Sequence, residues 1–201
     1  MNRRKFLKQS GQTVASGSAA AAGLWLLSTS TGHDPAGHRL PTEPATLRPP
    51  GALAETDFLA ACIRCQRCQD ACPSQAIQLA GPGDGVQRDT PFIRPTDHAC
   101  TLCLECTHVC PTGALRPVAN KADVHMGRAV VDERTCVSHN GSGVCGACHT
   151  ACPFRNTAIT QGLRNAPTVH PEHCVGCGLC EEACIVEGTK AIRVFSGRRI
   201  A

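Results

Sequence analysis

The sequence is poor in the aromatic side chains that fill most protein cores. It has no tyrosine, five phenylalanines and one tryptophan among 201 residues. Hydrophobic residues make up 42% of the chain when the sixteen cysteines are counted among them. Without the cysteines, roughly a third of the chain is apolar, which is too little for a generous hydrocarbon core. We therefore expect an inorganic component to help hold the fold together.

The sequence also lacks a concentrated charge. The formal net charge is +4, and Arg3, Arg4, Lys5 and Lys8 supply four positive charges before the first acid, Asp34. The remaining basic and acidic residues balance, so composition gives no sign of the basic footprint of a nucleic-acid binder. No G-x-S-x-G, H-E-x-x-H or dinucleotide fingerprint is present, so the motifs favour a protein that is not an enzyme.

The first 31 residues have the features of an export leader. A charged start that contains Arg3-Arg4-Lys5-Phe6-Leu7 is followed by an apolar stretch at 14–27, which is short for a membrane span of ~20 residues. The paired arginines resemble a twin-arginine signal, which implies export to the periplasm of a protein already loaded with its cofactor. The leader is either cleaved or kept as an anchor on the periplasmic side of the membrane. Residues 32–51 are rich in proline and glycine and predict an extended linker.

The rest of the chain, residues 52–201, is organised by four cysteine runs that start 38, 36 and 38 residues apart. Three runs have the spacing C-x2-C-x2-C-x3-C, and the third is stretched to C-x8-C-x2-C-x3-C by an insert at 137–144. Each run predicts a short strand, a cysteine loop and a helical turn. The runs are Cys62, Cys65, Cys68, Cys72; Cys100, Cys103, Cys106, Cys110; Cys136, Cys145, Cys148, Cys152; and Cys174, Cys177, Cys180, Cys184.

This spacing is the bacterial-ferredoxin pattern, in which three cysteines bind one [4Fe-4S] cluster and the fourth binds the other cluster of a pair. Four runs therefore predict four [4Fe-4S] clusters, with all sixteen cysteines as iron ligands. Disulfides, zinc sites and, at Cys145-Gly146-Ala147-Cys148-His149, a c-type haem are the competing interpretations. None of them accounts for the fourfold repeat. His108 and His149 lie within cysteine runs and are candidates for tuning a cluster potential.

The segments 47–52 and 58–65, and the fourth run at 174–184, resemble the NapG/MauM family of ferredoxin-type proteins. The resemblance implies an α+β fold of tandem ferredoxin-like modules, each with two clusters. It also implies a periplasmic relay between a membrane-bound, quinol-oxidising iron–sulfur protein and a periplasmic redox enzyme or cytochrome, of the nitrate-reductase or methylamine-utilisation type. Whether the runs pair as neighbours or in a nested order stays open. An assembly or maturation factor for a partner redox enzyme is the alternative function.

Overall fold

The computed structural model describes residues 46–197. The predicted leader, 1–31, lies outside these residues, as does most of the predicted linker. Residues 46–51, at the end of that linker, belong to the fold: Leu47, Arg48, Pro49 and Pro50 are buried. Within the described part of the chain, no helix has the length and apolar character needed to cross a membrane.

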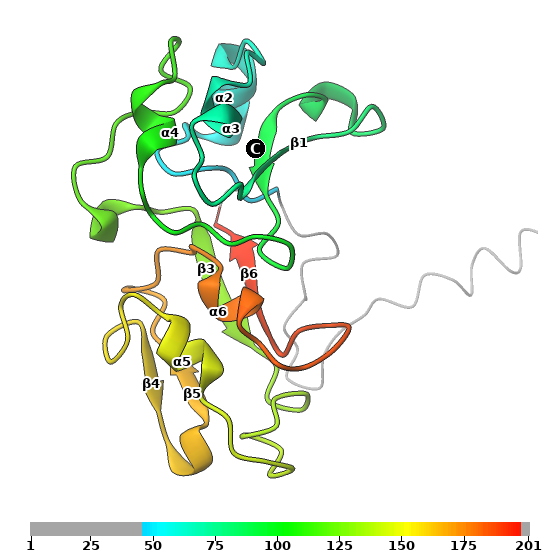
Figure 1. The fold of residues 1–201 in the computed structure, drawn as a ribbon, viewed down its shortest axis with the longest axis vertical. Helices are drawn as coiled ribbons and strands as arrows, with labels where there is room; N and C mark the ends of the chain where they lie inside the picture. Colours follow the sequence, from blue (N-terminus) through cyan, green and yellow to red (C-terminus); the bar gives the residue numbers. More distant parts are fainter. Residues whose placement is uncertain (1–45, 198–201) are drawn as a thin grey trace, which may run out of the picture. The chain divides into compact units, whose positions relative to one another are not determined.

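Short helices, strands and turns alternate along the chain, as the repeats predict (Figure 1). Residues 46–118, here the first module, and residues 119–197, here the second module, each hold two of the cysteine runs. The elements of the first module are α2 (Glu55–Ala61), α3 (Arg67–Asp70), β1 (Ile77–Leu79), η1 (Gly85–Gln87), β2 (Pro91–Ile93) and α4 (Glu105–His108). The second module contains η2 (Lys121–Asp123), β3 (Gly127–Val131), α5 (Ala147–Ala151), β4 (Ile159–Gln161), η3 (Leu163–Asn165), β5 (Pro167–Val169), α6 (Leu179–Glu182) and β6 (Ile192–Ser196).

The two modules repeat one antiparallel plan. In each, the segment after the first run pairs with the segment before the second run, with Ile77 opposite Ile93 in β1–β2 and Ile159 opposite Val169 in β4–β5. A second pairing joins the start of each module to its end. It is a five-residue ladder between β3 and β6 in the second module, but a single bridge from Ala52 to Leu115 in the first.

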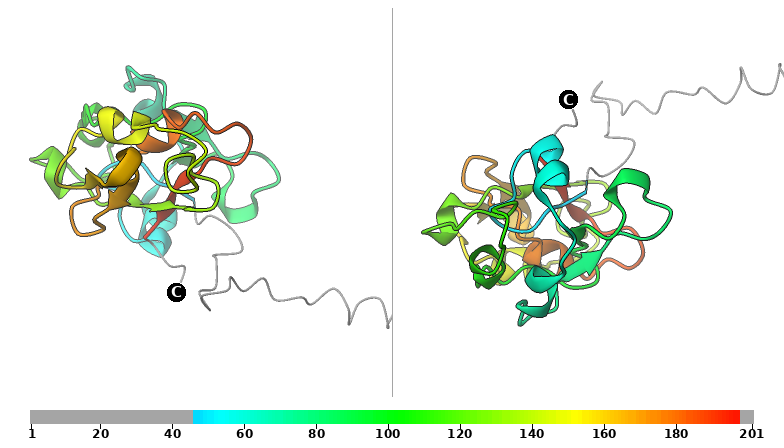
Figure 2. Two further views of the ribbon diagram at one scale, coloured as in Figure 1. Left: turned by 90° about the horizontal axis from the view of Figure 1, so that it is seen from below. Right: turned by 90° about the horizontal axis from the view of Figure 1, so that it is seen from above.

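The short helices within the cysteine runs pack in pairs. α3 lies against α4, and α5 lies against α6; the second pair is side by side in Figures 1 and 2. The buried residues form a continuous cluster that mixes apolar side chains such as Phe58, Leu115 and Met126 with cysteines from all four runs. Thiols therefore occupy much of the space that hydrocarbon side chains fill in other small domains.

Candidate metal centres

The first module gathers four thiols from two neighbouring runs around one pocket. Three come from the first run and the fourth is the last cysteine of the second run. This set, called site 1, consists of Cys62, Cys65, Cys68 and Cys110. The buried side chains of Phe58 and Leu115 form part of its apolar wall.

The other cysteines of the first module, called site 2, are Cys72, Cys100, Cys103 and Cys106. Burial, together with the nearby thiols of Cys100, Cys103, Cys68 and Cys72, raises the pKa of Cys106 to about 12. Three of these neighbours belong to site 2, and Cys68 belongs to site 1. The two sites of the first module therefore adjoin.

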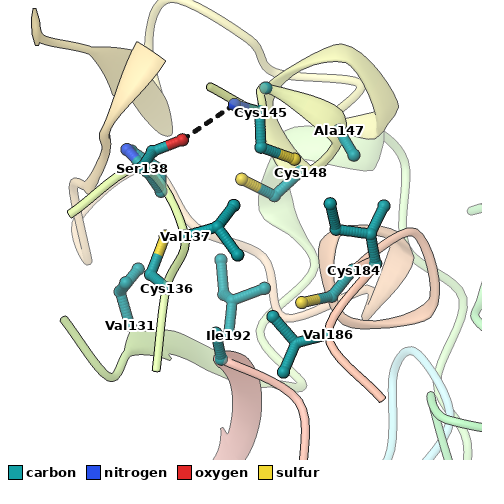
Figure 3. Close-up of a pocket in the computed structure, with 14 residues that line it drawn as sticks. Val131, Cys136, Val137, Ser138, Cys145, Ala147, Cys148, Cys184, Val186 and Ile192 are labelled. Atoms are coloured by element: carbon teal, nitrogen blue, oxygen red, sulfur yellow. Dashed lines mark hydrogen bonds between the residues drawn. The ribbon is translucent and has the colours of Figure 1, made fainter. Parts of the chain in front are cut away.

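The second module repeats this exchange of the last cysteine. Site 3 surrounds a pocket, and Figure 3 shows Cys145 and Cys148 next to each other, with Cys136 on one side and Cys184 on the other, beside Ile192 and Val186. Site 4 surrounds a second pocket of the same module. Site 3 consists of Cys136, Cys145, Cys148 and Cys184, and site 4 of Cys152, Cys174, Cys177 and Cys180. Neighbouring runs thus pair in both modules, which answers the question that the spacing leaves open.

The donor sets fit [4Fe-4S] clusters. All sixteen cysteines lie within the described residues and are free thiols. Within residues 46–197, no three Cys, His, Asp or Glu side chains are close enough to hold a single metal ion; at sites 1, 3 and 4 the four thiols instead line one shared pocket. Thiols spread in this way suit a cubane, in which each thiolate binds a different iron.

Each C-x2-C-x2-C loop bends through two residues in the left-handed region. Their φ values are +57° and +65° at Arg64 and Gln66, and +58° and +67° at Leu102 and Leu104. In the fourth run, glycines take the same places, at Gly176 and Gly178 with φ of +74° and +88°. The repeated backbone conformation explains why one spacing of cysteines recurs, since it folds three thiols around one centre.

Backbone N–H groups donate to several of the sulfurs. Leu102 N lies 3.4 Å from Cys100 Sγ, and Leu115 N lies 3.4 Å from Cys110 Sγ. Burial acts to raise the pKa of Cys110, but the Leu115 N–H and the Thr112 hydroxyl outweigh it and lower the pKa below its usual value. Hydrogen bonds of this kind stabilise a thiolate ligand and tune the potential of a bound cluster.

The insert of the third run is tied to the loop and to the β4–β5 hairpin. Cys145 N donates to the buried hydroxyl of Ser138 over 3.0 Å, and Asn165 Nδ2 donates to Cys145 O over 2.8 Å. Arg164 Nη1 donates to Gly141 O over 3.2 Å. The insert therefore packs beside site 3. His149, a sequence candidate for tuning, has its Nε2 2.9 Å from Asn156 Oδ1.

A buried ionic network beside site 1 has no counterpart among the sequence predictions. Arg48 is fully buried and donates from Nε and Nη2 to the two carboxylate oxygens of Glu55, over 3.1 and 2.5 Å. Its Nη1 donates to Thr90 Oγ1 and to Pro91 O, and its guanidinium lies 4.7 Å from the ring centre of Phe58. In the sequence, the prolines that follow Arg48 make this segment resemble a linker. The burial of Arg48 becomes evident only from its contacts with the distant Thr90 and Pro91.

Glu181 is a second buried acid that the sequence did not single out. It accepts a hydrogen bond from Val194 N over 2.6 Å, which ties α6 to β6. Burial raises the pKa of its carboxyl group.

Comparisons with known proteins agree with the site geometry. Residues 61–114 match a family described as a 4Fe-4S dicluster domain, and residues 167–187 match a 4Fe-4S binding domain. The methylamine utilization ferredoxin-type protein MauM of Methylorubrum extorquens is 44% identical over 164 residues, which cover 76% of this chain and 74% of the relative. MauM of Paracoccus denitrificans is 42% identical, with 77% and 73% covered. The ferredoxin-type protein NapG of Escherichia coli K12 is 37% identical, with 96% and 85% covered.

The dicluster match spans both runs of the first module, in keeping with the exchange of their last cysteines. The similarity to MauM and NapG extends over most of the chain. This chain therefore belongs to the NapG/MauM family of ferredoxin-type [4Fe-4S] electron-transfer proteins.

Proposed function

We propose that this protein is a periplasmic electron relay that holds four [4Fe-4S] clusters, one at each of sites 1 to 4, with all sixteen cysteines as ligands. A [4Fe-4S] cluster held by thiolates supplies one-electron redox chemistry. The protein supplies the positions, the burial and the hydrogen bonds to sulfur. The thiol sets and the two 4Fe-4S family matches support this function.

One contact between the modules carries the relay proposal. Cys100 N donates to Cys177 O over 2.9 Å, and the Cys177 thiol is among the groups that raise the pKa of Cys100. Site 2 therefore meets site 4. Within the first module, the thiol of Cys68 in site 1 helps to raise the pKa of Cys106 in site 2. Within the second module, the thiol of Cys148 in site 3 helps to raise the pKa of Cys180 in site 4. The order along the relay is site 1, site 2, site 4, site 3.

Glycine makes the junction possible. Gly178 has a φ of +88°, and a Cβ at this position would lie 2.5 Å from Pro95 Cβ and 3.6 Å from Ala99 Cβ. The fourth run can therefore approach the segment that leads into the second run. The relay depends on this approach, because it brings together the central sites of the two modules.

The thiols also couple cofactor loading to folding. Burial is the main cause that raises the pKa of Cys100 to about 12 and the pKa of Cys177 to about 11. Because iron binds the thiolate, these groups must lose their protons when they ligate metal. Cluster loading is therefore linked to proton release from this core, and completion of both before export suits a protein that leaves the cytoplasm with its cofactor bound.

We propose a membrane-bound, quinol-oxidising iron–sulfur protein as the electron donor and a periplasmic redox enzyme or cytochrome as the acceptor. The name of MauM connects it to methylamine utilization, and the identity of this chain to MauM is higher than its identity to NapG, although over a shorter stretch. A methylamine-utilisation system is therefore the first to test, with a nitrate-reductase system second.

Iron analysis and EPR of anaerobically purified protein test the function. The wild type should hold about sixteen irons, four at each site. Cys110→Ser should change the EPR signal of site 1, and Cys72→Ser that of site 2, while the second module keeps its signals. A nested pairing, of the first run with the fourth, would instead make Cys72→Ser disturb site 4. Far fewer irons after full reconstitution would refute the four-cluster proposal. If the protein supports maturation of a partner enzyme while its clusters do not change redox state during turnover, the assembly factor is favoured instead.

A further inference from the structure

We infer that the face around Cys65 is the docking surface for an electron-transfer protein that presents carboxylates around an apolar centre. This inference rests on the proposed relay, in which site 1 is one of the two ends. The surface consists of residues 63–67 of the first run and residues 86–88 around η1 (Gly85–Gln87). It is called the site 1 face below.

Exposure distinguishes this end from the rest of the relay. Among the sixteen cysteines, all of which the structure describes, Cys65 alone is exposed. Residues 63–67 form an unbroken exposed stretch around it. Electron transfer between proteins requires a short path from one cofactor to the next, so the end with the most accessible ligand is the natural contact point.

The same backbone carries different side chains in the second run. Arg64 and Gln66 are exposed, whereas Leu102 and Leu104, at the matching left-handed positions, are 1% and 9% exposed. Because the backbone conformation is shared, it does not require a polar residue at these places. The second run uses them to build the interior. The first run leaves them in solvent, where they are available to a partner.

The site 1 face combines apolar and basic groups. Ile63 is 61% exposed and Val86 is 75% exposed. Arg64 holds the two segments together, with Nε donating to Arg88 O over 2.9 Å and Nη2 donating to Val86 O over 3.2 Å. These two apolar side chains, on a surface fixed by the Arg64 hydrogen bonds, provide an apolar contact for a partner.

The charges of this face favour an acidic partner. Arg64 and Arg67 flank Cys65 in the sequence, and both are exposed. The face itself, residues 63–67 and 86–88, has three arginines and no acid. The neighbouring Asp89 pairs with Arg88 over 3.3 Å, and Asp84, which accepts a hydrogen bond from Gly81 N, keeps its charge outside the face. Asp70, at the end of α3, is the remaining exposed acid of the first run.

The site 3 end has exposed apolar residues as well, at Val144, Leu163 and Ile185. Its cysteines, however, are all half-buried or buried. The two ends therefore differ, and the most exposed cysteine lies at site 1. A relay whose ends differ in this way is suited to a transient partner at the end with the exposed cysteine, because transient interfaces are small and steered by charge.

Stopped-flow reduction by an acidic flavodoxin hydroquinone tests the surface, with the flavodoxin as a surrogate of the stated chemistry. The wild-type rate constant should fall as salt is raised, because salt screens the attraction. Arg67→Glu should lower the rate about tenfold at low ionic strength, and Arg67→Gln should lower it by less. Ile63→Ser should lower the rate at high salt also, because it removes an apolar contact.

Matched controls lie on the second module. Arg128→Glu makes the same charge change on an exposed position of β3, and Leu163→Ser removes an apolar side chain that is 86% exposed. When the variants are compared at about 0.1 M salt, where the Debye length is about 10 Å and steering is local, each should change the rate less than about twofold. Equal losses in Arg67→Glu and Arg128→Glu, or no loss in either, would overturn the docking surface.

Iron content, EPR signals and the extent of reduction by dithionite separate this inference from the relay itself. If these match the wild type while the flavodoxin rates do not respond to Arg67 or Ile63, only the docking surface fails. If the wild type itself lacks the four clusters, the proposed function fails. If Arg67→Glu loses iron, the docking surface is tested by Arg67→Gln and Ile63→Ser instead: lower rates than the wild type support it, and unchanged rates overturn it.

Discussion

Replacement of Arg48 by methionine should destabilise the first module more than any surface change. The side chain of Arg48 is 0% exposed and that of Glu55 is 6% exposed. Loss of the guanidinium leaves the Glu55 carboxylate buried without its partner, which costs about 3–5 kcal/mol. Against a total stability of about 5–15 kcal/mol, this is a large fraction.

Urea unfolding of the loaded protein under anaerobic conditions measures the effect. Far-UV circular dichroism should be followed together with the visible absorbance of the clusters. With an m-value of about 2 kcal/mol/M, the midpoint should fall by roughly 2 M. The signals of site 1 should be lost first, because Arg48 packs on Phe58 and Phe58 lines that site.

Two further variants make the test specific. Arg94 also lies over a phenylalanine, Phe92, and pairs with Asp97, but both charged groups are largely exposed. Arg94→Met should therefore cost less than about 1 kcal/mol. The double variant Arg48→Met/Glu55→Met should recover most of the loss, since an apolar pair can replace a buried ion pair. A single Arg48→Met variant as stable as Arg94→Met would refute the reasoning.

Three other predictions follow from the sites. Gly178→Ala should weaken the magnetic coupling between sites 2 and 4 in EPR, because the added Cβ would clash with Pro95. Gly113→Ala is the control: Gly113 has a φ of +70° and its Cβ would meet no atom within 4 Å, so this variant should impose only backbone strain and keep the coupling. Ser138→Ala should leave the Cys145 N–H without its partner, lower the stability by about 1–3 kcal/mol and shift the potential of site 3 in a redox titration. Removal of iron with ferricyanide and a chelator should abolish most of the dichroism signal, because thiols fill much of the core; a retained native spectrum would contradict this.

Local sequence predicts a large part of the fold. The spacing of each run predicts a strand, a cysteine loop and a helical turn, and the structure has these elements around every run except the first, which α2 precedes in place of a strand. The cysteine spacing works because three ligands come from one short loop, whose left-handed residues recur at Arg64, Leu102 and Gly176. Such a loop needs no distant contact to bring three thiols together.

Other features depended on residues far apart in the chain. The burial of Arg48 requires Thr90 and Pro91, some forty residues away, and a segment with two prolines resembles a linker until those partners are known. Leu102 and Arg64 share a backbone conformation but not an environment. Sequence spacing alone gives no sign of this difference.

The sequence by itself determined that sixteen thiols occur in four equivalent groups, because local spacing sets which three cysteines share a loop. Only the tertiary structure decided which loop receives each fourth cysteine, that sites 2 and 4 meet through Cys100 and Cys177, and that Cys65 stays exposed. These outcomes depend on packing within each module and between the two modules, and packing is set by the sum of many contacts between distant residues and not by the order of residues within one motif.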